Sequence, residues 1–289
     1  MKKVEDIISR INKIEIRTKE LVSESFLGNY HSSFKGSGIE FSEVKDYQFG
    51  DDVRTIDWNV SARMNAPYIK KFVEERELSL NLVIDISKSM EYGSGTASKK
   101  ETTAIIAGVL AFSALSNNDK VGLVLVSDRV ESYLPPAKGP EQLFRILRDI
   151  LFFEPYSSKS NISSGIDFLS SISHRKQIIF VLSDFSDFIP GKNWTISKKK
   201  HDIIPIIIED TREHTHAPSG IIDIEDPETG ELRTIVLSKH YKKWKEEYYK
   251  KQYSLLNEFR KIGQQFIIID EQTDIIKALN KFFRSKGKI

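Results

Sequence analysis

The spacing of hydrophobic positions changes along the chain and predicts regions of different kinds. From Val4 to about Val22, apolar residues recur at helical spacing, which predicts an amphipathic helix. From residue 26 to about residue 78 this periodicity disappears, and short apolar pieces alternate with turn signals such as GSG, GDD and NAP. We expect this stretch to form an irregular layer that docks on a core and does not fold alone.

After residue 78 the pattern changes to short apolar runs separated by amphipathic helices. This alternation is typical of a parallel sheet that helices cover on both faces. The sequence therefore predicts an α/β fold with a mostly parallel, Rossmann-like sheet. The expected strands are residues 80–85, 121–127, 177–183, 203–208 and 265–270.

Local signals fix several elements between and after these strands. Ser98 and Glu101 have the spacing of a capping box and predict a helix start, and Pro140 predicts another. Residues 220–237 carry two β-rich arms around a DPETG turn, which predicts an inserted hairpin. A long helix follows, with aromatic and aliphatic residues on one face and lysines on the other. We expect residues 1–78 to form an N-terminal layer and residues 79–289 to form the α/β domain.

Composition narrows the class of function. Lys and Arg number 43 against 41 Asp and Glu, so the net charge of +2 does not favour nucleic acid as a partner. The chain has no cysteine, which excludes disulfides, thiolate zinc sites and cysteine nucleophiles and fits a reducing compartment. Charges interrupt the N-terminal apolar residues, and no apolar run approaches the roughly 20 residues of a membrane span. We therefore expect a cytoplasmic protein without a membrane span.

The most informative site is SLNLVIDISKSM, where an apolar strand ends in Asp85 and continues as Asp-x-Ser-x-Ser. Ligands of open α/β sheets bind beyond the carboxyl ends of the strands, which is where Asp85, Ser87 and Ser89 would lie. Alternate residues of such a turn can direct their oxygens to one point, and Mg²⁺ prefers oxygen ligands. The motif therefore predicts a divalent-cation site.

A second strand end supports this interpretation. Asp184 directly follows the apolar run FVLS, and two carboxylates at neighbouring strand ends repel each other unless a cation lies between them. The alternative is that Asp184 caps the following turn. A further hydroxyl ligand would come from the segment YSSKSNISSG, where several residues compete. These are Ser157, Ser158, Ser160, Ser163 and Ser164.

These motifs resemble a known family. The Asp-x-Ser-x-Ser loop, the hydroxyl loop and the later strand-end aspartate resemble the metal-ion-dependent adhesion site of von Willebrand factor A domains. More specifically, GIEFSEVKDYQFGDDVRTIDWNVSARMNAPYIKKFVEEREL, residues 38–78, resembles the hallmark segment of the von Willebrand A-like family catalogued as domain of unknown function 58. DPETGE, residues 226–231, also resembles that family. The resemblance covers about residues 26–283.

The resemblance implies a metal site and a partner. It places Asp85, Ser87, Ser89 and Asp184 at metal positions, with Ser160 in the place of the usual threonine of the hydroxyl loop and Asn161 in the place of the acidic residue after it. The implied cation is Mg²⁺, or alternatively Mn²⁺ or Ca²⁺. Members of the family often accompany MoxR-type AAA+ ATPases, which implies such an ATPase as the partner.

The remaining polar clusters have ordinary interpretations. The hallmark acids and arginines could form a catalytic carboxylate cluster, but turns and ion pairs explain the same composition better, with Trp58 packed under the layer. The pair His214 and His216 could bind zinc, although a solvated loop is the simpler reading. We assign the lysines of residues 198–200 and 242–251 to the solvent-exposed faces of helices. The hallmark residues concerned are Asp51, Asp52, Arg54, Asp57 and Arg63.

Three functional hypotheses follow. The first is a non-enzymatic, metal-dependent interaction module that offers an open coordination position to an acidic side chain of a protein partner. The second is a metal-dependent hydrolase that uses Asp85 and Asp184, although no general base is evident in the sequence. The third is a scaffold that does not bind metal. Walker A, Rossmann glycine and G-x-S-x-G motifs are absent from the sequence.

Overall fold

The chain folds into two compact units. The structure is a computed structural model that describes residues 2–34, 40–73, 78–93, 98–173, 175–186, 188–211, 221–225 and 232–286. Unit 1 comprises Met1–Ser33 and Ser79–Ile289, and unit 2 comprises Phe34–Leu78. The predicted docking of the hallmark segment on the core stays a prediction.

A six-stranded sheet forms the centre of unit 1, in the order β10-β7-β6-β3-β4-β5. Neighbouring strands are parallel except for β4 and β5, which pair antiparallel. The strands are β3 (Ser79–Asp85), β4 (Lys120–Val126), β5 (Val130–Ala137), β6 (Ile178–Ser183), β7 (Asp202–Ile208) and β10 (Ile267–Ile269). Strand β3 comes first along the chain and lies inside the sheet, and the later strands are added on both sides of it. This is a doubly wound, Rossmann-like topology.

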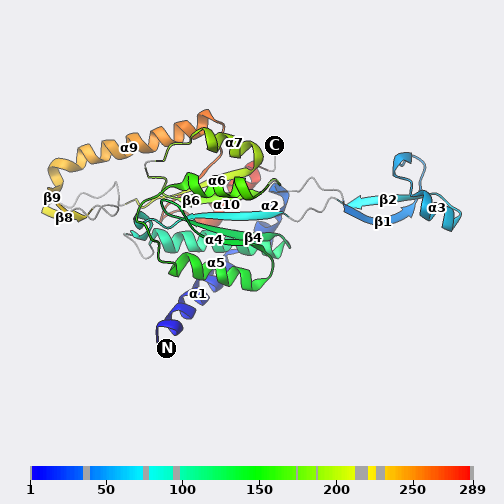
Figure 1. Cartoon of the computed structure of the whole chain (residues 1–289), viewed down its shortest axis with the longest axis horizontal. Coiled ribbons are helices and arrows are strands. Elements are labelled where there is room, and N and C mark those ends of the chain that lie inside the picture. Colours follow the sequence, from blue (N-terminus) through cyan, green and yellow to red (C-terminus); the bar gives the residue numbers. More distant parts are fainter. Residues whose placement is uncertain are drawn as a thin grey trace. The chain divides into compact units, whose positions relative to one another are not determined.

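Helices cover both faces of this sheet (Figure 1). In one layer α1 packs against α4 and α5, and α2 packs against α4 and α10, while α6 and α7 pack together in the other layer. The N-terminal helices therefore belong to unit 1. The helices are α1 (Lys2–Leu21), α2 (Glu24–Ser33), α4 (Lys99–Ser116), α5 (Pro140–Phe152), α6 (Ile162–Ile172), α7 (Lys192–Lys200), α9 (Leu237–Lys261) and α10 (Ile275–Lys286).

The core of unit 1 explains why the strands read as continuous apolar runs. Alternate residues of β3 and β6, such as Val83 and Val181, pack with α6 and with Trp194 of α7. Leu255 and Phe259 of α9 complete this cluster. Because side chains alternate across a strand, the residues between them face the opposite layer and are equally buried. Burial on both faces fixes the register of the strands and hence the positions of their carboxyl ends.

The expected α/β fold is confirmed by this sheet. All the predicted strands occur within one or two residues of their expected bounds, and Ser98 and Glu101 form the predicted capping box at the start of α4. The predicted hairpin strands are also present as β8 (Ile221–Glu225) and β9 (Leu232–Val236), which pair antiparallel. The DPETG turn between them lies outside the described residues.

Strand β5 was not predicted from the sequence. Its segment VESYLPPA contains two adjacent prolines, which cannot donate ladder hydrogen bonds. Proline is tolerated at the edge of a sheet, and β5 lies at the edge, beside β4. The topology therefore explains a strand whose composition argues against one.

Unit 2 is more regular than the irregular layer that its sequence predicts. Strands β1 (Glu40–Asp46) and β2 (Tyr68–Val73) pair antiparallel, with a register shift between Phe41 and Glu43. A 3₁₀ turn, η1 (Val53–Thr55), and a short helix, α3 (Trp58–Met64), lie between them. The pairing of β1 with β2 spans a long connection, which local periodicity does not reveal.

The hallmark acids of unit 2 stabilise turns and helix starts. Asp52 accepts a hydrogen bond from the backbone N–H of Arg54, and Asp57 accepts from the N–H groups of Asn59 and Val60. These backbone bonds lower the pKa of Asp57, and a bond from the N–H of Gln48 likewise lowers the pKa of Asp51. The described bonds of these acids therefore serve a turn and two helix starts, as the turn interpretation of the hallmark predicts.

One detail of the sequence interpretation of unit 2 is corrected. The described ion-pair partners of Asp51 and Asp57 are Lys45 and Lys70, at 3.3 and 3.5 Å, in place of the expected arginines. Trp58, the first residue of α3, is 72% exposed, and its packing under the layer stays a prediction.

Candidate functional site

The loop after β3 folds around the carboxylate of Asp85. Asp85 is the last residue of the strand and is 2% exposed. Its Oδ1 accepts a 2.9 Å hydrogen bond from the backbone N–H of Ser87, and the hydroxyl oxygens of Ser87 and Ser89 lie 3.2 Å apart. The 3₁₀ turn η2 (Lys88–Glu91) follows directly and fixes the loop. The Asp-x-Ser-x-Ser spacing therefore gathers three oxygen-bearing side chains at one strand end.

The loop before α6 brings a fourth oxygen to this point. The hydroxyl of Ser160 donates a 2.8 Å hydrogen bond to Oδ2 of Asp85. Two backbone bonds hold the loop in place, from Lys88 N to the carbonyl of Ser158 at 3.1 Å and from Asn161 N to the carbonyl of Ser127 at 2.7 Å.

The competing serines of that segment make other contacts. The backbone N–H of Lys159 donates to the hydroxyl of Ser157, and Ser164 donates its hydroxyl to the carbonyl of Asn161. Ser158 contributes its carbonyl, as described above, and Ser163 lies in the first turn of α6. Ser160 is thus the serine of this segment whose described hydrogen bond reaches Asp85.

The end of β6 supplies the second carboxylate and a residue that sequence reasoning missed. Ser183 is fully buried and donates a 2.6 Å hydrogen bond from its hydroxyl to Oδ2 of Asp85. The same hydroxyl accepts a bond from the N–H of Phe185, whose φ of 53° is in the left-handed region. Asp184 caps this turn by accepting from the N–H of Ser186 at 3.0 Å. The capping alternative for Asp184 is therefore correct, and it coexists with a position in the cluster.

The electrostatics of the site couple the two carboxylates. Burial raises the pKa of Asp85, and the negative charge of Asp184 raises it further. Hydrogen bonds from Ser183 and Ser87 act in the opposite direction. The net effect is a raised pKa, so the surroundings of Asp85 disfavour its charged form. A cation close to Asp85 would favour the charged form.

A lysine reaches one of these carboxylates, Asp184. The ammonium of Lys99, the first residue of α4, lies 3.2 Å from Oδ2 of Asp184. The two side chains are 3% and 6% exposed. Nothing in the local sequence of α4 indicates this contact, because 85 residues separate the partners. A sequence search for acidic and hydroxyl ligands could not have found it.

The acidic edge continues beyond β6. Glu209 directly follows β7, and burial raises its pKa. A 2.5 Å hydrogen bond from Gln252 of α9 acts in the opposite direction and lowers this pKa. Asp270, which follows β10, raises the pKa of Glu209 further, whereas the charge of Lys99 lowers it. Since these strands are parallel, their carboxyl ends bring the acids to one edge.

Other candidates from the sequence lie elsewhere. His214 and His216 fall outside the described residues. Lys198 is half-buried, and its ammonium donates to the carbonyls of Ile262 and Gly263. It therefore caps the end of α9 and does not lie on the solvent-exposed helix face that the sequence predicts. Within the described residues, no group of three or more His, Cys, Asp or Glu side chains could hold a metal.

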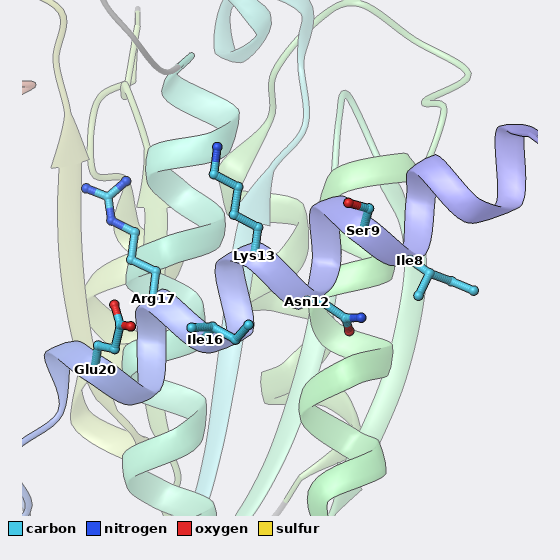
Figure 2. A pocket seen from close by; sticks show the side chains of 7 residues that line it. All are labelled: Ile8, Ser9, Asn12, Lys13, Ile16, Arg17 and Glu20. Carbon is cyan, nitrogen blue, oxygen red and sulfur yellow. The ribbon is translucent and has the colours of Figure 1, made fainter.

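A hollow on the surface of α1 shares no residue with this site. Figure 2 shows its lining along one face of the helix, including the partly exposed Ile8 and Ile16. Nothing in the described part of the chain shows what covers this face. In the same described part, no helix is long and apolar enough to cross a membrane.

A doubly wound, mostly parallel sheet with carboxylates and hydroxyls gathered at its carboxyl edge defines unit 1 as a Rossmann-like α/β domain. The chain belongs to the family described as "Protein of unknown function DUF58", whose profile matches residues 43–254. The resemblance of the hallmark segment to that family is thereby confirmed.

The chain has relatives of similar sequence and solved structures of similar fold. It is 25% identical over 233 residues to the uncharacterized protein Rv1480 of Mycobacterium tuberculosis. The aligned residues make up 78% of this chain and 73% of the relative. The conserved hypothetical protein BatB from Bacteroides thetaiotaomicron is similar in structure, with a TM-score of 0.49, 15% identity and coverage of 73% of this chain and 100% of that chain. The SpRpn10 VWA domain has a TM-score of 0.38 and 12% identity, and covers 71% and 94% of the two chains.

Proposed function

We propose that this protein is a non-enzymatic, metal-dependent protein-interaction module. The observation that carries the proposal is the convergence of hydroxyl oxygens from two separate segments, at Ser160 and Ser183, on the buried Asp85. The donors are carboxylates and hydroxyls, which suit a hard cation such as Mg²⁺ or alternatively Mn²⁺ or Ca²⁺. The residues that would hold the cation are Asp85, Ser87, Ser89, Ser160 and Asp184.

The bound cation would offer a free coordination position to an acidic side chain of the partner. The protein's own residues prepare this contact by keeping their oxygens at the sheet edge, where a backbone bond from Lys88 N to the carbonyl of Ser158 joins the loops after β3 and before α6. Ser160 and Ser183 orient Asp85 through their hydroxyls. The partner class, a MoxR-type AAA+ ATPase, follows from the family resemblance, and we place the pair in the cytoplasm.

The roles of the two carboxylates argue against the hydrolase alternative. Asp85 and Asp184 would both hold the cation, and a hydrolase needs a further general base that accepts a proton from water or substrate. No such base is evident in the sequence. We therefore favour recognition over catalysis.

Co-purification with a candidate MoxR-type ATPase tests the proposal. We expect the complex to form with Mg²⁺ and to be lost with EDTA or with Asp85→Ala. Asp149→Ala is the matched control, because Asp149 pairs with Arg148 on α5 and is not part of the site. A complex that survives both EDTA and Asp85→Ala would show that recognition does not use the metal, and would favour the metal-free scaffold.

A further inference from the structure

Lys99 occupies a position that helix formation does not explain. It is the first residue of α4, and its side chain is 3% exposed. A positive charge is unfavourable at a helix N-terminus, and lysine is almost never fully buried unless it is paired. The acids that Lys99 meets at the sheet edge therefore explain its position.

These acids come from neighbouring strand ends. The Lys99 ammonium lies 3.2 Å from Oδ2 of Asp184 after β6, and its charge also acts on Glu209 after β7. Asp184 in turn acts on Asp85 at the end of β3. The ammonium of Lys99 thus lies near buried carboxylates that repel one another, and its positive charge reduces this repulsion.

The backbone of Lys99 is fixed where α4 begins. The N–H of Lys99 donates to the carbonyl of Tyr92 at 2.9 Å, and the capping box of Ser98 and Glu101 fixes the helix start. Glu101 also pairs with Arg10 of α1 at 2.7 Å. The ammonium is therefore tethered to a fixed backbone, and its distance from Asp184 depends on the conformation of its four-carbon stem.

We propose that Lys99 is a tethered counter-ion of these carboxylates and that it competes with a divalent cation for Asp184. The competition rests on the metal-dependent function proposed above. The Lys99 ammonium already lies 3.2 Å from Oδ2 of Asp184, so a cation that binds this oxygen meets the positive charge of Lys99. A divalent cation and an ammonium at one buried oxygen repel each other, and one must leave.

Two opposite effects of one substitution follow. Lys99→Met removes the counter-ion, so the metal-free protein loses stability because an unpaired buried carboxylate remains. The same substitution removes the competitor, so a divalent cation binds more tightly. Lys99 would thereby keep the site folded without metal and set the concentration at which metal binds.

Calorimetric titration with Mg²⁺ and with Mn²⁺, together with thermal unfolding in EDTA, tests this inference. We expect Lys99→Met to bind the cation at least about ten-fold more tightly than wild type and to unfold at a lower temperature in EDTA. The matched control is Lys100→Met, which removes the neighbouring half-buried lysine of α4. If Lys99→Met does not fold, Lys99→Gln removes the charge and retains a hydrogen-bond donor.

The outcomes separate this inference from the proposed function. Equal affinity of wild type, Lys99→Met and Lys100→Met would overturn the competition and leave the metal-dependent function standing. Binding by Lys99→Met alone would support the inference and show that the native protein does not depend on metal. If no variant binds either cation, the competition and the metal-dependent function are both wrong. An unchanged unfolding temperature of Lys99→Met in EDTA would overturn the counter-ion role.

Discussion

The hydroxyl of Ser183 donates a 2.6 Å hydrogen bond to Oδ2 of Asp85, across the neighbouring strands β6 and β3. The same hydroxyl accepts a hydrogen bond from the N–H of Phe185. One buried hydroxyl therefore joins the carboxylate of Asp85 to the turn that carries Asp184. The orientation of both acids therefore depends on a residue that is not itself an acid.

Substitution of this serine tests its role. We expect Ser183→Ala to lower the free energy of unfolding by about 1–3 kcal/mol, because it leaves a buried carboxylate and a buried N–H without this partner. Chemical denaturation of the metal-free protein measures the loss. Ser186→Ala is the control, since that residue is exposed and contacts Asp184 through its backbone. Equal stabilities of the two variants would contradict this role.

Metal titration tests the predicted ligands. We expect Asp85→Ala to abolish Mg²⁺ or Mn²⁺ binding and Ser160→Ala to weaken it by about 10–100-fold, as removal of supporting residues does at other metal sites. Ser164→Ala should bind like wild type, because its hydroxyl donates to the carbonyl of Asn161. Wild-type affinity of Asp85→Ala would remove the site, and a larger effect at Ser164 than at Ser160 would show that the wrong serine was chosen.

His201 should make stability depend on pH. It is 2% exposed, and neither ring nitrogen has a hydrogen-bond partner among the described residues. Burial lowers the pKa of His201 below its ordinary value of 6.5. When the pH falls below about 6.5, the unfolded chain takes up a proton at this residue more readily than the folded chain, so stability is lost. The full contribution is present above that pH.

Unfolding by urea between pH 7.5 and 5 measures this dependence. We expect the stability of His201→Leu to fall less steeply with decreasing pH than that of wild type. His31→Leu, which removes an exposed histidine of α2, serves as the control. Parallel curves for wild type and His201→Leu would show that His201 does not contribute.

The contact between α1 and α4 depends on Gly108. A Cβ at this position would lie 2.6 Å from Oγ1 of Thr18, which is fully buried. We expect Gly108→Ala to destabilise the protein by about 1–3 kcal/mol through this overlap. The double variant with Thr18→Ala should recover stability, because the overlap is gone and alanine favours the helix. If Thr18→Ala gives no recovery in thermal unfolding, the overlap is not the cause.

We predict that residues 34–78 dock on unit 1. The sequence lacks long periodic apolar elements in this stretch, so we expect it to depend on the core for stability. Limited proteolysis of the intact protein should degrade the segment once it is released, without a stable intermediate. Recovery of an intact, folded fragment of residues 34–78 would contradict this expectation.

The amino-acid sequence by itself determined the parallel strands β3, β4, β6, β7 and β10, the start of α4 and the position of Asp85 at a strand end. These features are local, because apolar runs, capping residues and strand ends depend on residues a few positions apart. The spacing of Ser87 and Ser89 relative to Asp85 was likewise readable from one short segment, and the structure gathers these residues at the end of β3.

Only the tertiary structure decided which distant residues meet Asp85 and Asp184. Ser160, Ser183 and Lys99 contact these acids across sequence separations of 75, 98 and 85 residues. Such contacts depend on the order of strands in the sheet and on the loops that its edge brings together, neither of which is encoded in a local pattern. For the same reason the proline-containing edge strand β5 became apparent only beside β4, where its composition is tolerated.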